Sequence, residues 1–122
     1  MATASISLTQ TSAVIARALD VLRASQALRL DDAEISALAA ALDGVPAFSI
    51  ELFGSRTDST ARGGDIDILI LSEAPRLETA RRVSSRFFMH CEERIDVVVL
   101  DPARLSVAEE AFLRSLRRVR IA

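Results

Sequence analysis

One short segment limits the folds open to this chain: residues 65–71, Asp-Ile-Asp-Ile-Leu-Ile-Leu. After its two aspartates the segment is apolar at every position, so a strand formed here would have no face suited to water. Such a strand must be covered on both sides, which requires other elements packed against it in layers. The segment therefore predicts a layered α/β domain in which residues 65–71 form a central strand.

The rest of the chain supplies candidates for those layers. Apolar residues recur at helical spacing in four segments, at about 11–25, 32–43, 75–92 and 106–120. Two further segments have the pattern of strands, at 48–53 and 95–100. Asp31 with Glu34, and Ser106 with Glu109, form capping boxes that mark two helix starts. Residues 1–10 read as a loose polar lead-in.

These segments predict one domain over residues 1–122. It would have N-terminal helices at about 11–43, a core at about 47–101 and a C-terminal helix at about 106–120. The composition agrees, because 50% hydrophobic residues are enough for a sizeable core. The apolar stripe of the first helix fits the core, or a face for a second copy of the chain or another partner.

Composition also excludes several classes of protein. The net charge of -2 gives no strong signal for nucleic-acid binding. No stretch reaches the roughly 18 apolar residues of a membrane span, and the start MATASISLTQ lacks the pattern of a signal peptide. Because Cys91 is the single cysteine, no internal disulfide can form, and we expect a cytoplasmic location.

Acidic residues open the central strand in a way that suggests chemistry. Side chains alternate faces along a strand, so Asp65 and Asp67 point the same way. Two carboxylates this close repel each other and are costly to desolvate, and a divalent cation with oxygen ligands relieves that cost. Asp96 occupies a similar place in the strand at 95–100. If the two strands are neighbours, the three aspartates converge on one or two Mg²⁺ ions, and two ions about 3.5–4 Å apart suit in-line displacement at phosphorus.

The loop before the strand offers groups that bind phosphate. Gly54 and Ser55 stand where a strand ends and a turn begins, and glycine lets backbone N–H groups approach a phosphate closely. Arg56 and Arg62 could neutralise phosphate oxygens. A plainer alternative stays open for each group: a tight turn for Gly54, solvated charges for the arginines, and solvated strand ends for the aspartates.

The stretch GSRTDSTARGGDIDILIL resembles the signature of the DNA polymerase beta-like nucleotidyltransferases. That signature is Gly-Ser, a spacer, and Asp-x-Asp at the start of a hydrophobic strand, with a third carboxylate at the position of Asp96. The short chain resembles the minimal nucleotidyltransferase (MNT) branch. The resemblance implies a short mixed β-sheet of three to four strands flanked by helices. It also implies that Asp65, Asp67 and Asp96 are catalytic and hold Mg²⁺, or Mn²⁺ in its place, and that Gly54 and Ser55 bind the triphosphate.

The resemblance further implies an activity. A minimal nucleotidyltransferase would move a nucleoside monophosphate, AMP from ATP, onto an acceptor hydroxyl. Stand-alone MNT proteins are similar to the antitoxins of toxin–antitoxin pairs, so the acceptor would be a hydroxyl, often of Tyr, on a helical HEPN-type partner. Two alternatives remain. The chain could be a catalytically silent binding module, because the Arg-Gly pair expected soon after Gly-Ser appears only at Arg62-Gly63. It could also act on small molecules with a separate helical subunit.

Overall fold

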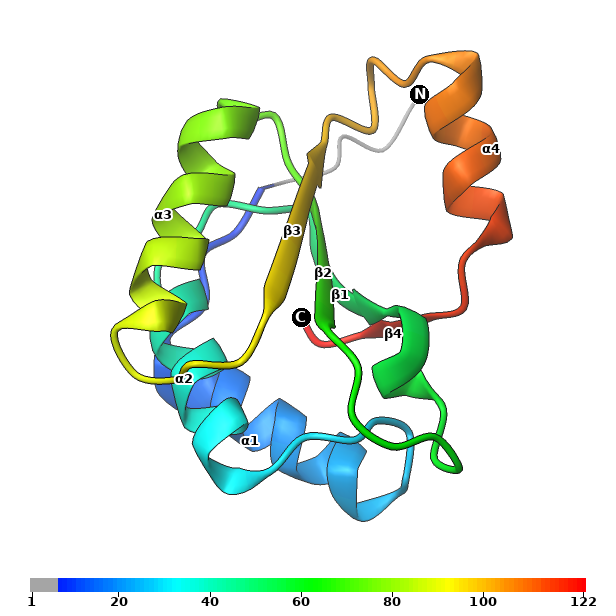
Figure 1. Cartoon of the computed structure of the whole chain (residues 1–122). Coiled ribbons are helices and arrows are strands. Elements are labelled where there is room, and N and C mark those ends of the chain that lie inside the picture. Colours follow the sequence, from blue (N-terminus) through cyan, green and yellow to red (C-terminus); the bar gives the residue numbers. More distant parts are fainter. Residues whose placement is uncertain (1–6) are drawn as a thin grey trace.

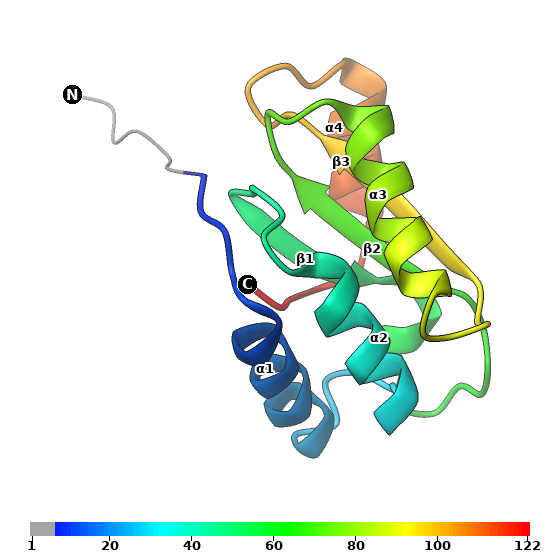
Figure 2. The same cartoon turned by 90° about the vertical axis from the view of Figure 1, so that its left-hand side faces the viewer.

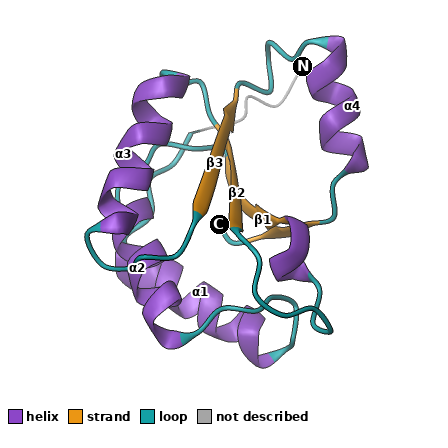
Figure 3. Cartoon of the chain, viewed as in Figure 1, coloured by secondary structure: helices purple, strands orange, loops and turns teal. Residues whose placement is uncertain are grey.

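The computed structural model describes residues 7–122, and these form an α+β fold with four helices, one short 3-10 helix and a mixed four-stranded sheet flanked by helices (Figures 1 and 3). In chain order the elements are α1 (Ser12–Ala24), α2 (Asp32–Leu42), β1 (Ser49–Phe53), η1 (Gly54–Thr57), β2 (Ile66–Leu71), α3 (Arg76–Phe88), β3 (Ile95–Leu100), α4 (Val107–Ser115) and β4 (Arg118–Arg120). Residues 1–6 of the predicted lead-in lie outside the described residues.

The strand predicted at 65–71 is β2, which begins one residue later at Ile66 and is central in the sheet as its composition predicts. The strand order is β3-β2-β1-β4, with β2 parallel to β3 and antiparallel to β1, and with β1 antiparallel to β4. Because β2 and β3 run in the same direction, their first residues meet at one end of the sheet. That end lies next to η1, at the bottom of the sheet in Figure 1.

Two layers of unequal size cover the sheet. Helices α1, α2 and α3 lie on one face, and they stand in front of the sheet in Figure 2. Ile66, Ile68 and Ile70 of β2 point into the large core beneath them. Leu69 points to the opposite face and joins a small cluster with Phe53 and Leu100, under α4. No residue of α4 is buried, so this second layer is thin and leaves room for polar side chains.

The C-terminal helix is shorter than the sequence predicts. Helix α4 ends at Ser115, Leu116 is extended (φ −84°, ψ 139°), and the residues predicted as the helix end form β4 instead. The reason is the edge of β1, which would otherwise carry unpaired backbone groups. Val119 lies opposite Leu52 in this pairing, and the alternation Arg-Val-Arg suits an edge strand better than a helix. Four arginines lie near the C-terminus, and only Arg114 is in the last turn of α4; the others are Arg117, Arg118 and Arg120.

Other local predictions can be compared directly. Both capping boxes are present, with backbone N–H and side-chain carboxylate bonds in each. The lead-in is not loose where it is described, because Leu8 and Ala47 exchange two backbone hydrogen bonds of 3.0 Å. Within the described part of the chain, no helix is long and apolar enough to cross a membrane.

Neighbouring phenylalanines at the end of α3 test its orientation. Phe87 is fully buried, whereas Phe88 is 52% exposed. We expect Phe87→Ala to lower the free energy of unfolding by about 3–5 kcal/mol through lost burial and a new cavity. Phe88→Ala should cost about 1 kcal/mol or less, because it loses mainly the edge contact with Phe87. Urea unfolding of both variants would check this, and equal losses would contradict the placement of α3.

Candidate active site

A row of four side chains crosses the sheet at the end where β2 and β3 begin. Asp96 of β3 is opposite Asp67 of β2, Asp67 is opposite Phe53 of β1, and Phe53 is opposite Arg118 of β4. Directly opposite residues point to the same face of a sheet. Phe53 belongs to the cluster under α4, so the whole row lies on the α4 face. The sheet thus brings together two of the three predicted metal ligands.

Asp67 is the most perturbed member of this row. Partial burial raises the pKa of Asp67 above its ordinary value, and the negative charges of Asp96 and then Asp65 raise it further. Asp96 itself is exposed, and Asp65 is exposed just before β2 begins. Among the described residues, no arginine forms an ion pair or a hydrogen bond with these three carboxylates, so their mutual repulsion is not neutralised. The site is therefore electrostatically strained in a way that a cation would relieve.

The Gly-Ser turn packs directly against Asp67. A Cβ at Gly54 would lie 2.4 Å from Oδ2 of Asp67, and the backbone there has φ +79°. Only glycine accepts both conditions without a shift of the carboxylate. Gly64 has the same relation to Ser55, because a Cβ at Gly64 would lie 2.4 Å from the Ser55 Oγ, at φ +87°. Two glycines therefore hold the turn and its serine hydroxyl beside the start of β2.

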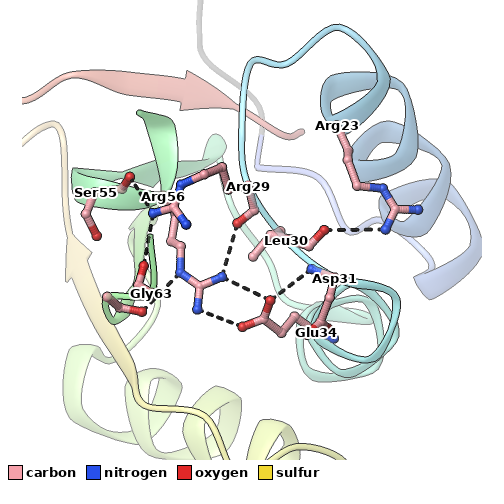
Figure 4. Close-up of polar contacts among 9 residues, drawn as sticks. Arg23, Arg29, Leu30, Asp31, Glu34, Ser55, Arg56 and Gly63 are labelled. Atoms are coloured by element: carbon pink, nitrogen blue, oxygen red, sulfur yellow. Dashed lines mark hydrogen bonds and ion pairs between the residues drawn. The ribbon is translucent and has the colours of Figure 1, made fainter. Parts of the chain in front are cut away.

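Arg56 has a different role from the phosphate contact predicted for it. Arg56 is 6% exposed, and its guanidinium forms a forked pair with Glu34 through bonds of 2.9 and 2.8 Å (Figure 4). It also donates to the carbonyl oxygens of Gly64 and Arg29. Four of its five N–H groups are occupied, so Arg56 holds the loop in place and is not available as a phosphate ligand.

Two residues that the sequence did not single out as site residues complete this support. Arg29, between α1 and α2, donates to the carbonyl oxygens of Asp58, Ser55 and Gly63, and its backbone N–H bonds to Arg56 (Figure 4). Glu34, recognised only as part of a capping box, accepts from both Asp31 and Arg56. The capping-box motif was visible in the sequence, but nothing there revealed that its Glu is buried at 3% exposure.

The remaining loop residues stay available to a ligand. Ser55 and Arg62 are both exposed. Within the described residues, neither the Ser55 hydroxyl nor the Arg62 guanidinium has a hydrogen-bond partner. Their positions are compatible with the predicted contact to phosphate.

The donor set fits a hard cation in combination with a ligand. Among residues 7–122, no group of three or more His, Cys, Asp and Glu side chains is spaced to hold a metal ion by itself. Mg²⁺ is usually bound by one or two carboxylates together with substrate phosphates and water, so a complete protein cage is not required. The Asp67–Asp96 pair supplies that minimum, and Asp65 lies close enough to influence the pKa of Asp67.

Comparisons of the chain with protein-family models, with curated proteins and with solved structures found no match. A functional interpretation therefore depends on the sequence motif and on the geometry of this site.

The Arg56–Glu34 pair gives a first prediction for the site. Arg56→Ala should lower the free energy of unfolding by about 3–5 kcal/mol, because it leaves the Glu34 carboxylate buried without its cation. Arg62→Ala, an equal change of charge in the same loop, should stay within about 0.5 kcal/mol because Arg62 is exposed. Chemical denaturation would measure both. Similar losses would show that the Arg56 pair is not a buried anchor.

Asp67 gives a second prediction, on pH. Its pKa is raised in the folded state, so its favourable contribution is complete below the unfolded pKa of about 3.9 and is lost as the pH rises through the folded pKa. Asp67→Asn should therefore raise the metal-free melting temperature at pH 7, by about 1–3 °C for such a half-exposed group. The gain should shrink toward pH 4. Glu92→Gln, at an exposed site, is the control for net charge, and a gain that is equal at both pH values would contradict the assignment.

Proposed function

We propose that this chain is a metal-dependent nucleotidyltransferase that transfers AMP from ATP to a hydroxyl group of a partner protein. The observation that carries the proposal is the Asp67–Asp96 carboxylate pair, in which Asp67 packs against Gly54 of the Gly-Ser turn. A divalent-cation site and a phosphate-binding turn in contact are the two parts that phosphoryl transfer requires. The mixed sheet with its flanking helices is compatible with the polymerase beta-like fold implied by the motif.

The site residues would divide the chemistry between them. Asp67 and Asp96, with Asp65 beside them, would hold Mg²⁺, which supplies neutralisation of the phosphate charge. The Ser55 hydroxyl and the backbone at Gly54 would bind the triphosphate, with Arg62 as an exposed cation at the rim. The acceptor oxygen would form a bond to the α-phosphorus of ATP, and the bond from that phosphorus to pyrophosphate would break. Asp96 is the exposed member of the pair and would accept the proton of the incoming hydroxyl.

The acceptor in this proposal comes from the resemblance. MNT antitoxins suggest a hydroxyl, often of Tyr, on a HEPN-type helical partner in the cytosol. Asp96 is exposed, which agrees with an acceptor that arrives from outside the chain. The chain could also associate with a second copy of itself while acting as the proposed nucleotidyltransferase.

One second function is favoured by a specific observation. The described residues contain no complete three-ligand metal cluster, and Arg56 is committed to Glu34. A binding module with a metal-competent but silent site would have these properties, and it would neutralise its partner by contact alone.

Binding of nucleotide and metal tests the site itself. We expect Mn²⁺ with ATP to raise the melting temperature more than either ligand alone, because phosphate oxygens complete the coordination of the metal. Asp67→Asn should remove this joint effect, whereas Glu92→Gln should keep it. No change of melting temperature for the wild-type chain under any of the three conditions would refute the proposed site.

Transfer tests the reaction. The chain would be co-expressed with the product of the adjacent reading frame, and the intact mass of that product would be measured. The wild-type chain should give an adduct of one AMP or more, and Asp96→Asn should reduce it by orders of magnitude. The silent binding module would be favoured by two results together. The chain would bind Mn²⁺ with ATP but give no adduct, and the Asp67→Asn variant would still neutralise the partner protein.

A further inference from the structure

The structure leaves the candidate phosphate site short of cations. The sequence offers Arg56 and Arg62 for this purpose, but Arg56 is buried against Glu34. Arg29 is also engaged, because it donates to three carbonyl oxygens of the loop. Only Arg62 remains of the arginines in the loop, and it is exposed at the rim. A triphosphate carries several negative charges, so a further cation on the same face is needed to balance them.

We propose that Arg118 of β4 binds the phosphate chain of the nucleotide, a role that depends on the proposed nucleotidyltransferase function. Arg118 stands opposite Phe53, the residue immediately before Gly54 and Ser55. It lies in the same cross-strand row as Asp67 and on the same face. Arg118 therefore lies on the side of the Gly-Ser turn that is opposite to the two carboxylates.

The dimensions of the row suit a polyphosphate. Neighbouring strands are about 4.8 Å apart, so the backbones at Asp67 and Arg118, two strands apart, are separated by roughly 10 Å. A metal-bound phosphate near Asp67 and a second phosphate within reach of Arg118 can belong to one extended chain. Phe53 lies between them in the row, 8% exposed and packed edge-on against Phe112 of α4. It supplies no competing charge, and the phosphate chain would pass beside it, along Gly54 and Ser55.

Glu51 orients the Arg118 side chain but leaves hydrogen-bond donors of its guanidinium free. Its Nε lies 3.6 Å from Oε1 of Glu51, and the side chain is 33% exposed. Glu51 is itself held, because its other carboxylate oxygen accepts a 2.9 Å bond from the Ser49 hydroxyl. Within the described residues, the two terminal amino groups of Arg118 have no partner. Glu51 is thus a positioning residue, and the terminal amino groups are left to bind a phosphate bidentately.

Arg120, a second arginine on the same strand and the same face, is engaged elsewhere. Arg120 lies two residues further along β4, and its guanidinium donates to the carbonyl oxygens of Ala122 and Phe48. Its donors are directed away from the Gly-Ser turn, toward the opposite end of β1. Arg120 therefore has the same charge and lies on the same strand as Arg118, but its guanidinium is not placed to contact a phosphate at the Gly-Ser turn.

Titration calorimetry with Mn²⁺ present tests the assignment with three probes: ATP, inorganic tripolyphosphate and adenosine. Arg118→Gln should weaken binding of ATP and of tripolyphosphate by about tenfold or more, because it removes charge-assisted bonds to phosphate. Binding of adenosine, whatever its strength, should not change. Arg118→Lys should lie between the two, since it keeps the charge but loses the fork. Arg120→Gln is the matched control and should bind ATP as the wild type does.

Each outcome separates this role from the proposed function. If the wild type binds neither ATP nor tripolyphosphate, the proposed function fails and the role of Arg118 fails with it. If the wild type binds ATP and Arg118→Gln binds it equally well, the nucleotide site stands and the role of Arg118 is refuted. Should Arg118→Gln fold poorly because Glu51 loses its cation, the double variant Glu51→Gln with Arg118→Gln removes that carboxylate charge, and the same tenfold loss is expected.

Discussion

The buried ion pair between Glu34 and Arg56 fixes the part of the structure on which the candidate site depends. Breaking such a pair is expensive because one charge would remain buried alone, so the two side chains stay together and bring their backbones with them. Glu34 belongs to the cap of α2, and Arg56 belongs to η1, at a separation of 22 residues. Arg56 and Arg29 also bind four carbonyl oxygens of η1 and the following loop, at Ser55, Asp58, Gly63 and Gly64. The helical layer therefore sets the position of the loop relative to the sheet.

The sheet supplies the other half of the site through its register. Because β2 and β3 are parallel and start together, Asp67 and Asp96 are brought side by side without any need for a special turn. The close approach of Gly54 then places the anchored loop against Asp67. Two independent constraints, a buried ion pair and a strand register, meet at Gly54. A side chain at this position would have to displace either the carboxylate or the loop, which explains why the turn requires glycine there.

Sequence reasoning predicted those features that depend on local patterns. The apolar run of β2 and the capping boxes are readable from spacing alone. The meeting of Asp67 with Asp96 was predicted only on the condition that their strands are neighbours, which they are. Other features that depend on distant partners were not predicted. The burial of Arg56 depends on its ion pair with Glu34. Residues Arg118–Arg120 form a strand because the edge of β1 is open to pair with them. The sequence predicted a helix to about residue 120, but residues 118–120 pair with β1 instead.

The arginines illustrate this difference most clearly, since all fifteen basic residues are arginine and composition cannot separate their roles. Arg56, next to the Gly-Ser turn in sequence, is buried, whereas Arg118, more than sixty residues away, lies in the row with Asp67. The row has carboxylates at one end and a guanidinium at the other, with Phe53 between them. A metal-free polyphosphate would meet repulsion at the acidic end, and a metal ion without phosphate would lack ligands there. The charge order of the row therefore favours a metal and a polyphosphate bound together over either one alone.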